Sequence, residues 1–212
     1  MQVQIQSNDF TLDVSGALFW DAEKVLFIAD LHLGKIEHFR ANGSAIPQEA
    51  SLKNYSKLDE VIQHYQPSEI VFLGDLFHSI KNKSWIDFES WVKKQQAKIT
   101  LVVGNHDLIA KSNFEKLGIE VCLEWKRDFI YGTHHPSTSE GLLNLCGHIH
   151  PGYFLKGLGK QNLKLSCFYL KEKQFILPAF GGFTGKYMIT PEDGERIFVL
   201  GENQVFEVPI LQ

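Results

Sequence analysis

Histidine, aspartate and asparagine residues gather in five short motifs between residues 30 and 150. In chain order the motifs are Asp30-Leu31-His32, Gly74-Asp75, Gly104-Asn105-His106-Asp107, His134-His135 and Gly147-His148-Ile149-His150. Each motif follows an apolar run, where the end of a strand can place its side chains at the rim of a sheet. A single Gly-Asp or His-x-His usually has a structural role, but five such motifs after apolar runs indicate one common site.

Carboxylate and imidazole groups in these motifs suit two adjacent divalent metal ions, which need nitrogen and oxygen ligands and one shared anionic oxygen. Asp30 and His32 are two residues apart on an extended segment, so both can face one ion. His148 and His150 can divide between two ions. Asp75 is the natural bridging carboxylate.

Asn105 adds a neutral oxygen, which limits the negative charge around the ions and keeps them electrophilic. The motifs contain no thiol, which disfavours a structural zinc site. Such a ligand set admits manganese, iron, zinc, nickel or cobalt. The residue types therefore predict a hydrolytic site with two divalent ions.

The order of the motifs resembles the signature of the calcineurin-like metallophosphoesterase superfamily: Asp-x-His, Gly-Asp, Gly-Asn-His-Asp/Glu, His and Gly-His-x-His. The resemblance implies an α/β fold, a four-layer αββα sandwich of two mixed β-sheets flanked by helices. It also implies a phosphodiesterase in which a metal-bridging hydroxide attacks phosphorus, with manganese as the expected metal. The implied ligands are Asp30, His32, Asp75 and His150 for the first ion and Asp75, Asn105, His134 and His148 for the second.

The fourth motif contains two adjacent histidines, and either can be the ligand. His134 is preferred because it comes first after the strand, which leaves His135 beside the ligands or on the substrate side. A hydrogen-bonded turn histidine before Pro136 is the structural alternative for His135.

The histidine of Gly-Asn-His-Asp lies over the site in the resembled family without binding metal. That position is His106 in this chain, and the resemblance implies that His106 protonates or hydrogen-bonds the leaving oxygen, a general-acid role. Asp107 would either orient His106 or act as a capping or turn residue. We therefore expect His106 and Asp107 to be the catalytic pair.

Residues outside the metal motifs resemble PdeM-type phosphoesterases, a branch described as DNA ligase-associated DNA damage response endonucleases. The similar positions are 29–35, 39–40, 47, 73–79, 167–168 and 177–185. Lys186 departs from the pattern, which has a second small residue there. The resemblance implies a phosphodiester substrate such as DNA and association with DNA repair proteins.

Three other functions are open to the same motifs. Gly74-Asp75 is followed by Leu76-Phe77-His78-Ser79, without the Asp-Arg-Gly of serine/threonine protein phosphatases, so that class is disfavoured. A cyclic nucleotide or another small diester fits the metal chemistry and suits the pI of about 6.1 somewhat better than DNA does. A non-catalytic scaffold on the same fold has no use for a histidine over the metals.

Cations and aromatic rings near the metal motifs are candidates for substrate binding, because single strands are held by phosphate attraction and base stacking. With a net charge of −4, any attraction for phosphate must be local. Solvated charges and core aromatic rings are the structural alternatives. The candidates are Lys35, Arg40, His78, His135 and Lys186, with Phe39, Phe180, Phe183 and Tyr187 as stacking surfaces.

Apolar periodicity predicts a βαβαβ order in the N-terminal half, which implies parallel strands. The expected strands are 25–29, 69–73 and 99–103, and the expected helices are 51–65, with Ser51 as its N-cap, and 85–96. Residues 1–6 also alternate like a strand. Short strands are expected at 119–122, 129–131, 142–146, 163–170, 174–177, 196–200 and 204–208, and a flexible loop beside the site at 152–164. Mixed strand order suggests two sheets packed face to face.

The length of 212 residues and the hydrophobic content of 44% suit one metallophosphoesterase domain over residues 1–212. We expect no signal peptide and no membrane span, since no apolar run approaches about 18 residues. The three cysteines are odd in number and lack CxxC spacing, so free thiols in a reducing cytoplasm are expected.

Overall fold

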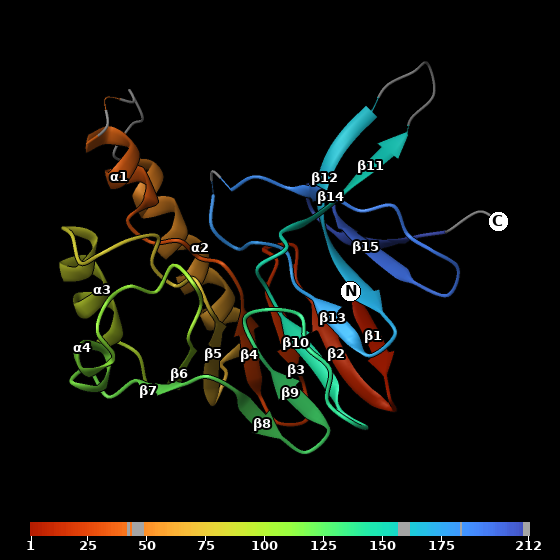
Figure 1. Cartoon of the computed structure of the whole chain (residues 1–212), viewed down its shortest axis with the longest axis horizontal. Helices are drawn as coiled ribbons and strands as arrows, with labels where there is room; N and C mark the ends of the chain where they lie inside the picture. Colours follow the sequence, from red (N-terminus) through yellow and green to blue (C-terminus); the bar gives the residue numbers. More distant parts are fainter. Residues whose placement is uncertain (42, 44–48, 157–161, 183, 210–212) are drawn as a thin grey trace.

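Two β-sheets packed face to face form the centre of the structure, a computed structural model that describes residues 1–41, 43, 49–156, 162–182 and 184–209 (Figure 1). The first sheet has seven strands in chain order. Strands β1 to β4 pair antiparallel, and β4 to β7 pair parallel. The strands are β1 (Gln2–Ile5), β2 (Asn8–Leu12), β3 (Leu18–Trp20), β4 (Val25–Ile28), β5 (Glu69–Leu73), β6 (Lys98–Val102) and β7 (Glu120–Cys122).

The second sheet has nine strands in the order β14-β11-β12-β13-β10-β9-β8, with β15 beside β12 and β16 beside β15. β10 lies parallel to β9 and β13, whereas β12 is antiparallel to β11, β13 and β15. The strands are β8 (Trp125–Arg127), β9 (Ile130–Gly132), β10 (Leu143–Cys146), β11 (Pro151–Lys156), β12 (Asn162–Lys171), β13 (Gln174–Ile176), β14 (Tyr187–Met188), β15 (Arg196–Leu200) and β16 (Val205–Val208).

The helices lie together beside β4 to β7 of the first sheet (Figure 1). They are α1 (Lys35–Ala41), α2 (Glu49–Tyr65), α3 (Ser84–Val92) and α4 (Lys111–Glu115). The expected α/β fold with two mixed sheets is confirmed. No helix follows α4 in the described residues, so the helical layer seen there belongs to the first sheet. None of the helices in the described residues is long and apolar enough to cross a membrane.

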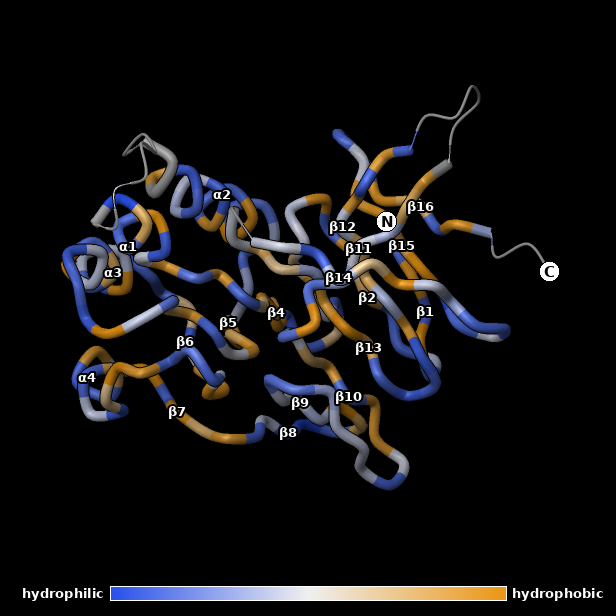
Figure 2. The backbone as a smooth tube through the Cα atoms, turned by 45° about the horizontal axis from the view of Figure 1, so that its top comes forward, coloured by the Kyte–Doolittle hydropathy of each residue, from blue (hydrophilic) through white to orange (hydrophobic). Residues whose placement is uncertain are grey.

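Alternating side chains along each strand divide the apolar core into layers. In β5, Ile70 and Phe72 belong to the cluster shared with the helices, and Val71 belongs to the cluster between the sheets. In β12, Phe168 enters the cluster between the sheets, while Cys167 packs in a third cluster on the opposite face. Figure 2 shows apolar stretches on central strands such as β5, β10 and β13. Because the central strands pack side chains on both faces, the positions of their ends are fixed. The segments that carry the five motifs follow these ends and are therefore fixed as well.

Several predicted elements differ from the structure in extent. Helix α2 begins at Glu49, so Ser51 lies inside the helix rather than at its N-cap, and α3 ends at Val92 rather than at residue 96. The strands β2, β3 and β8 and the helix α4 were not expected. These elements are short, and pairing with distant residues supports the strands more than local periodicity does.

The loop predicted at residues 152–164 is wrong throughout its described part, residues 152–156 and 162–164, which belong to strands. Residues 151–156 form β11, which pairs antiparallel with β12, while residues 157–161 lie outside the described residues. Gly152, one of the glycines that suggested a loop, lies where a Cβ would be 2.9 Å from the Cβ of Lys186. Its role is therefore close packing between strands rather than flexibility.

Candidate metal centre

Parallel strands β4, β5 and β6 end at the same edge of the first sheet, and the first three motifs follow them directly. Asp30 and His32 come after β4, Asp75 after β5 and Asn105 after β6. The side chains of Asp30, His32 and Asp75 are almost fully buried. Strand ends of one sheet thus deliver three charged or ionisable groups and one amide to one place.

The second sheet supplies the remaining candidate ligands from the ends of two strands. His134 follows β9, and His148 and His150 follow β10, which is parallel to β9. A carboxylate of the first sheet connects to these motifs: Asp30 Oδ2 accepts the backbone N–H of His148 at 2.9 Å. The site therefore lies where the motif-bearing edges of the two sheets meet.

Five of the seven candidate ligands adopt left-handed backbone conformations. The φ angles are 53° at Asp30, 51° at His32, 50° at Asp75, 66° at His148 and 51° at His150. This conformation costs a residue with a Cβ about 1–2 kcal/mol. The surrounding packing and hydrogen bonds must supply that energy, as is common at functional sites.

One group of candidate ligands joins Asp30, His32 and His150. The Nε2 atoms of His32 and His150 lie 3.5 Å apart, and His150 Nε2 lies 3.3 Å from Asp30 Oδ1. Asp75 Oδ2 lies 4.0 Å from His32 Nε2. The four residues that the resemblance assigns to one ion are thus brought together.

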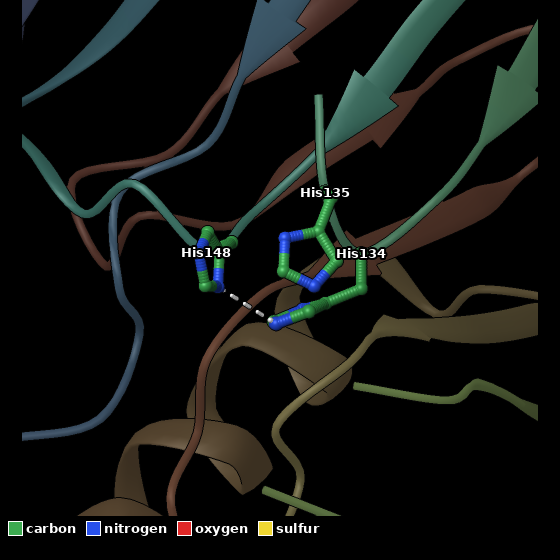
Figure 3. Close-up of side chains that lie close together, drawn as sticks. All are labelled: His134, His135 and His148. Atoms are coloured by element: carbon green, nitrogen blue, oxygen red, sulfur yellow. Dashed lines mark hydrogen bonds between the residues drawn. The ribbon is translucent and has the colours of Figure 1, made fainter. Parts of the chain in front are cut away.

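A second group surrounds the buried ring of His134. Its Nε2 lies 2.9 Å from Asn105 Oδ1, 3.4 Å from Asp75 Oδ1 and 3.2 Å from His148 Nδ1. Figure 3 shows the rings of His134 and His148 pointing toward one another. Asp75 contacts both groups, one through each carboxylate oxygen.

The two adjacent histidines of the fourth motif occupy different environments. His134 is only 3% exposed, and its Nδ1 donates to the carbonyl of Leu73 at 3.0 Å. That hydrogen bond leaves Nε2 to face Asn105 and Asp75, as expected for a metal-binding histidine. His135 is exposed, and its ring lies 4.0 Å from the ring of His148 (Figure 3). The geometry therefore favours His134 for the ligand position and leaves His135 at the rim.

Burial keeps two of the imidazoles in their neutral form. It lowers the pKa of His32 to about 2, with the nearby Lys35 charge as the next contribution. Burial also lowers the pKa of His148, helped by the neighbouring His135 and His134. Neutral rings offer a lone pair to a cation without first losing a proton.

His106 lies over the first group of ligands without joining it. Its backbone N–H donates to Asp75 Oδ1 at 2.9 Å, and its ring centroid is 5.7 Å from that of His32. The His106 ring stacks on His78, with centroids 5.1 Å apart and planes at 20°. His78, expected only as a substrate-binding candidate, thus contacts the candidate general acid.

Asp107 has the turn role rather than the orienting role. Its carboxylate accepts the backbone N–H groups of Phe77 at 3.0 Å and Gly104 at 2.9 Å. Among the described contacts, none joins this carboxylate to the ring of His106. Burial raises the pKa of Asp107 to about 6, although these two backbone hydrogen bonds oppose the shift.

A family model for calcineurin-like phosphoesterases matches residues 23–178, which contain all five motifs. The chain belongs to this family. As a member, this phosphoesterase is a metal-dependent enzyme, which confirms the expected enzyme class.

Two similar proteins extend the comparison. Over 88 residues the phosphoesterase is 33% identical to the DNA double-strand break repair protein Mre11 of Nanoarchaeum equitans (strain Kin4-M). That match covers 39% of this chain and 23% of the relative, so this chain aligns with less than a quarter of the relative's length. The crystal structure of Pseudomonas putida nuclease MPE is similar over nearly the whole chain, with a TM-score of 0.84 and 28% identity. The match covers 98% of this phosphoesterase and 99% of that nuclease.

The donor atoms of the phosphoesterase fit the divalent ions that the family uses. Asp30 Oδ1 is buried and accepts no hydrogen bond from the described residues, although His150 Nε2 lies 3.3 Å away. Because the N–H at His134 Nδ1 donates to the Leu73 carbonyl, the lone pair on its Nε2 faces two further acceptors, Asn105 Oδ1 and Asp75 Oδ1. Acceptor atoms whose lone pairs converge in this way repel one another unless a cation lies among them.

The remaining substrate-binding candidates of the phosphoesterase lie in different surroundings. Lys35 begins α1 and is half-buried near Asp30 and Asp75. Burial lowers the pKa of its amine overall, although the charges of the two carboxylates act to raise it. Arg40 is exposed in the last turn of α1, and no described contact joins it to the ligands. Phe39 lies beside His78, with ring centroids 6.4 Å apart.

Phe180 is the aromatic candidate that the structure contradicts. It is 1% exposed and belongs to the core cluster under the helices, so its ring cannot stack on a base. Tyr187 is 67% exposed and stays available, and Lys186 is exposed beside it. Phe183 and Pro47 lie outside the described residues.

Two residues outside the proposed ligand and substrate-binding sets also help to build the site. Gly147 is one: a Cβ there would lie 2.4 Å from Asp30 Oδ2. Lys57 is another, since its amine donates to the carbonyl of Phe180 at 2.8 Å from across the chain. The glycine could be anticipated from its place beside His148, but the lysine could not, because nothing local to α2 marks a contact with residue 180.

Proposed function

We propose that this phosphoesterase hydrolyses phosphodiester bonds in DNA with the help of two divalent ions, manganese being the expected metal. Asp30, His32, Asp75 and His150 would hold one ion, and Asp75, Asn105, His134 and His148 the other. The observation that carries the proposal is Asp75, whose two carboxylate oxygens face the two groups of imidazoles at 4.0 and 3.4 Å. A carboxylate shared in this way suits a pair of ions rather than a single one.

Bound divalent ions supply Lewis acidity, which lowers the pKa of water toward neutrality and withdraws charge from phosphoryl oxygens. The protein supplies the positioning. His106 is held by its N–H contact to Asp75 and by its stack on His78, so that its ring can deliver a proton to the leaving oxygen. Such proton transfer contributes about 10²- to 10⁴-fold to rate.

DNA is the proposed polymer because of the nuclease similarity. The similarity to nuclease MPE covers nearly both chains at 28% identity, and a second match is to Mre11, a DNA double-strand break repair protein. Lys35 adds a cation beside the two carboxylates, where a phosphate would lie. We also propose a role in DNA repair and association with repair proteins.

The test uses metal-stripped protein reloaded with manganese and several classes of substrate side by side. The substrates are bis-p-nitrophenyl phosphate, p-nitrophenyl phosphate, 2′,3′- and 3′,5′-cyclic AMP, single-stranded DNA and double-stranded DNA. His106→Ala is the active-site variant, and His64→Ala is its matched control, because His64 is exposed on α2.

We expect wild type and His64→Ala to cleave DNA, and His106→Ala to lose about 10²-fold or more while it keeps its metal. Hydrolysis of small diesters with intact DNA would overturn the DNA assignment and support a small-molecule diesterase. No hydrolysis of any substrate by metal-loaded protein would overturn the enzyme mechanism and favour the scaffold hypothesis.

A further inference from the structure

A groove with basic walls lies between α2 and a facing segment, residues 179–182 and 184–186. Its volume is about 350 Å³, and its walls include Lys53, Asn54 and Lys57 from α2 and Lys186 from the facing segment. No described residue that lines it is an aspartate or a glutamate. The chain as a whole has a net charge of −4, so the charge of the groove is opposite to that of the protein.

Two backbone hydrogen bonds fasten the facing segment to the first ligand group of the candidate metal centre. The backbone N–H of Gly181 donates to the carbonyl of Asp30 at 3.1 Å, and that of Tyr187 donates to the carbonyl of His150 at 3.0 Å. In Figure 1 this part of the chain runs from β13 toward α2 and returns to β14. The groove therefore begins beside two of the proposed ligands.

Close packing fixes the segment against its surroundings. A Cβ at Gly181 would lie 2.1 Å from the carbonyl oxygen of Leu31, so the segment touches the backbone of the first motif. On the other side, the N–H of Gly182 donates to the side chain of Asn54 on α2 at 3.3 Å. These contacts hold the two walls of the groove at a set separation.

The lysines of the groove have different roles. Lys57 is half-buried, donates to the carbonyl of Phe180 and lies 4.0 Å over the Phe180 ring, so it holds the wall in place. Lys53 and Lys186 are exposed, and neither forms an ion pair with a described residue. Their charges are thus available to an anion in the groove.

We propose that this groove binds phosphate groups of a nucleic-acid strand on one side of the bond that is hydrolysed. Lys53 and Lys186 would contact the phosphates, and the exposed ring of Tyr187 would stack on a base. This inference rests on the proposed hydrolysis of DNA and adds the surface that follows the strand. A small diester has one phosphate and cannot occupy the metal centre and the groove together, whereas a strand has one phosphate for every nucleotide.

The variant that tests the groove is Lys53→Glu with Lys186→Glu. Its matched control is Lys94→Glu with Lys116→Glu, which makes the same change in net charge. Lys94 and Lys116 are exposed and precede β6 and β7, so they lie toward the opposite edge of the first sheet. Circular dichroism and metal content should be the same in both variants.

Two readouts follow the variants. The first is the ratio of kcat/KM for single-stranded DNA to kcat/KM for bis-p-nitrophenyl phosphate, which should fall about tenfold or more in the groove variant and stay near the wild-type ratio in the control. The second is binding of a labelled single-stranded oligonucleotide to metal-free protein across a range of salt. The slope of log K against log salt should decrease by about 0.7 for each phosphate that the variant no longer neutralises.

An unchanged ratio together with an unchanged slope in the groove variant would overturn the inference. Equal losses in the groove and control variants would also overturn it, since they would show a general effect of charge. Failure of the proposed function looks different: the wild-type enzyme itself would cleave no strand, and the binding readout would still test the groove.

Discussion

The imidazole of His134 lies against the backbone of Gly74, so that a Cβ on Gly74 would be 2.2 Å from the His134 Nδ1 atom. No real Cβ contact is that short, and the φ of +84° at Gly74 also disfavours a side chain. The same ring is fixed by its hydrogen bond to Leu73. A residue that contributes no side chain therefore decides where a proposed ligand lies.

Gly74→Ala should displace the His134 ring and weaken metal binding without removing any ligand. We expect loss of one metal equivalent and a fall in kcat of about 100-fold, because a displacement of about 1 Å at a reacting centre has that effect. Gly118→Ala is the control, since Gly118 has φ +79° but open space around its Cβ position. It should lose about 1–2 kcal/mol of stability and keep its metal. Equal metal content in the two variants would contradict the prediction.

Asp75→Asn should remove the charge that both groups of ligands share. We expect less than one metal ion per chain by elemental analysis and a rate at least about 100-fold below wild type. Loss of a residue that only hydrogen-bonds to a metal ligand lowers activity by about 100-fold at most. Asp193→Asn, at an exposed turn position, serves as the control. Two metal ions per chain in the Asp75 variant would argue against a bridging role.

His134→Ala and His135→Ala should separate the two histidines of the fourth motif. The buried His134 faces Asn105 and Asp75, so its loss should remove one metal equivalent and nearly all activity. His135 is exposed at the rim, and its loss should leave the metal content at the wild-type value and act on KM. The reverse result, with metal lost only from His135→Ala, would reassign the ligand.

Glu69→Gln should destabilise the fold at the edge of the first sheet opposite the metal centre. Glu69 is buried and accepts hydrogen bonds from Thr100 at 2.7 Å and Arg127 at 2.5 Å, with Lys98 at 3.2 Å. Loss of its charge should lower the free energy of unfolding, measured in urea, by about 1–3 kcal/mol. The cost stays below that of breaking a fully buried ion pair because Arg127 and Lys98 are partly exposed. Glu120→Gln, which also pairs with Lys98 but is exposed, should cost about 0.5 kcal/mol or less.

The cost of Glu69→Gln should also depend on pH. Burial alone would raise the pKa of Glu69, but hydrogen bonds from Thr100 and Arg127 and the Lys98 charge together lower it below the ordinary value of 4.5. A carboxylate with a lowered folded-state pKa contributes its stability fully above the unfolded pKa and loses it as the pH falls through the folded pKa. The difference between wild type and variant should thus be largest above pH 4.5 and shrink below it. A difference that grows on acidification would contradict this sign.

The sequence predicts the place of the site better than its surroundings. Asp30, Asp75 and His148 follow apolar runs, and the position of a strand end depends on such runs, which are local. The strand β11 depends on pairing with β12, as the pairing of Gly152 with Ser166 illustrates. Local patterns contain no record of that partner.

The same limit applies to individual side chains. Phe180 and Tyr187 are both aromatic residues after Leu177, but one is buried in the core and the other is exposed, because only the first packs under α2. Asp107 has two plausible roles in sequence, and only its contacts with Phe77 and Gly104 distinguish them. Burial and hydrogen-bond partners are properties of the folded chain.

The proposed ligands come from both sheets: Asp30, His32, Asp75 and Asn105 from the first, and His134, His148 and His150 from the second. Ions held between them would fasten one sheet to the other, since a ligand that binds only the native state stabilises it. Removal of the ions by a chelator would then weaken the packing of one sheet against the other as well as stop catalysis. The two halves of the chain should unfold as one cooperative unit when loaded and less cooperatively when stripped, with earlier hydrogen exchange at the ends of β9 and β10.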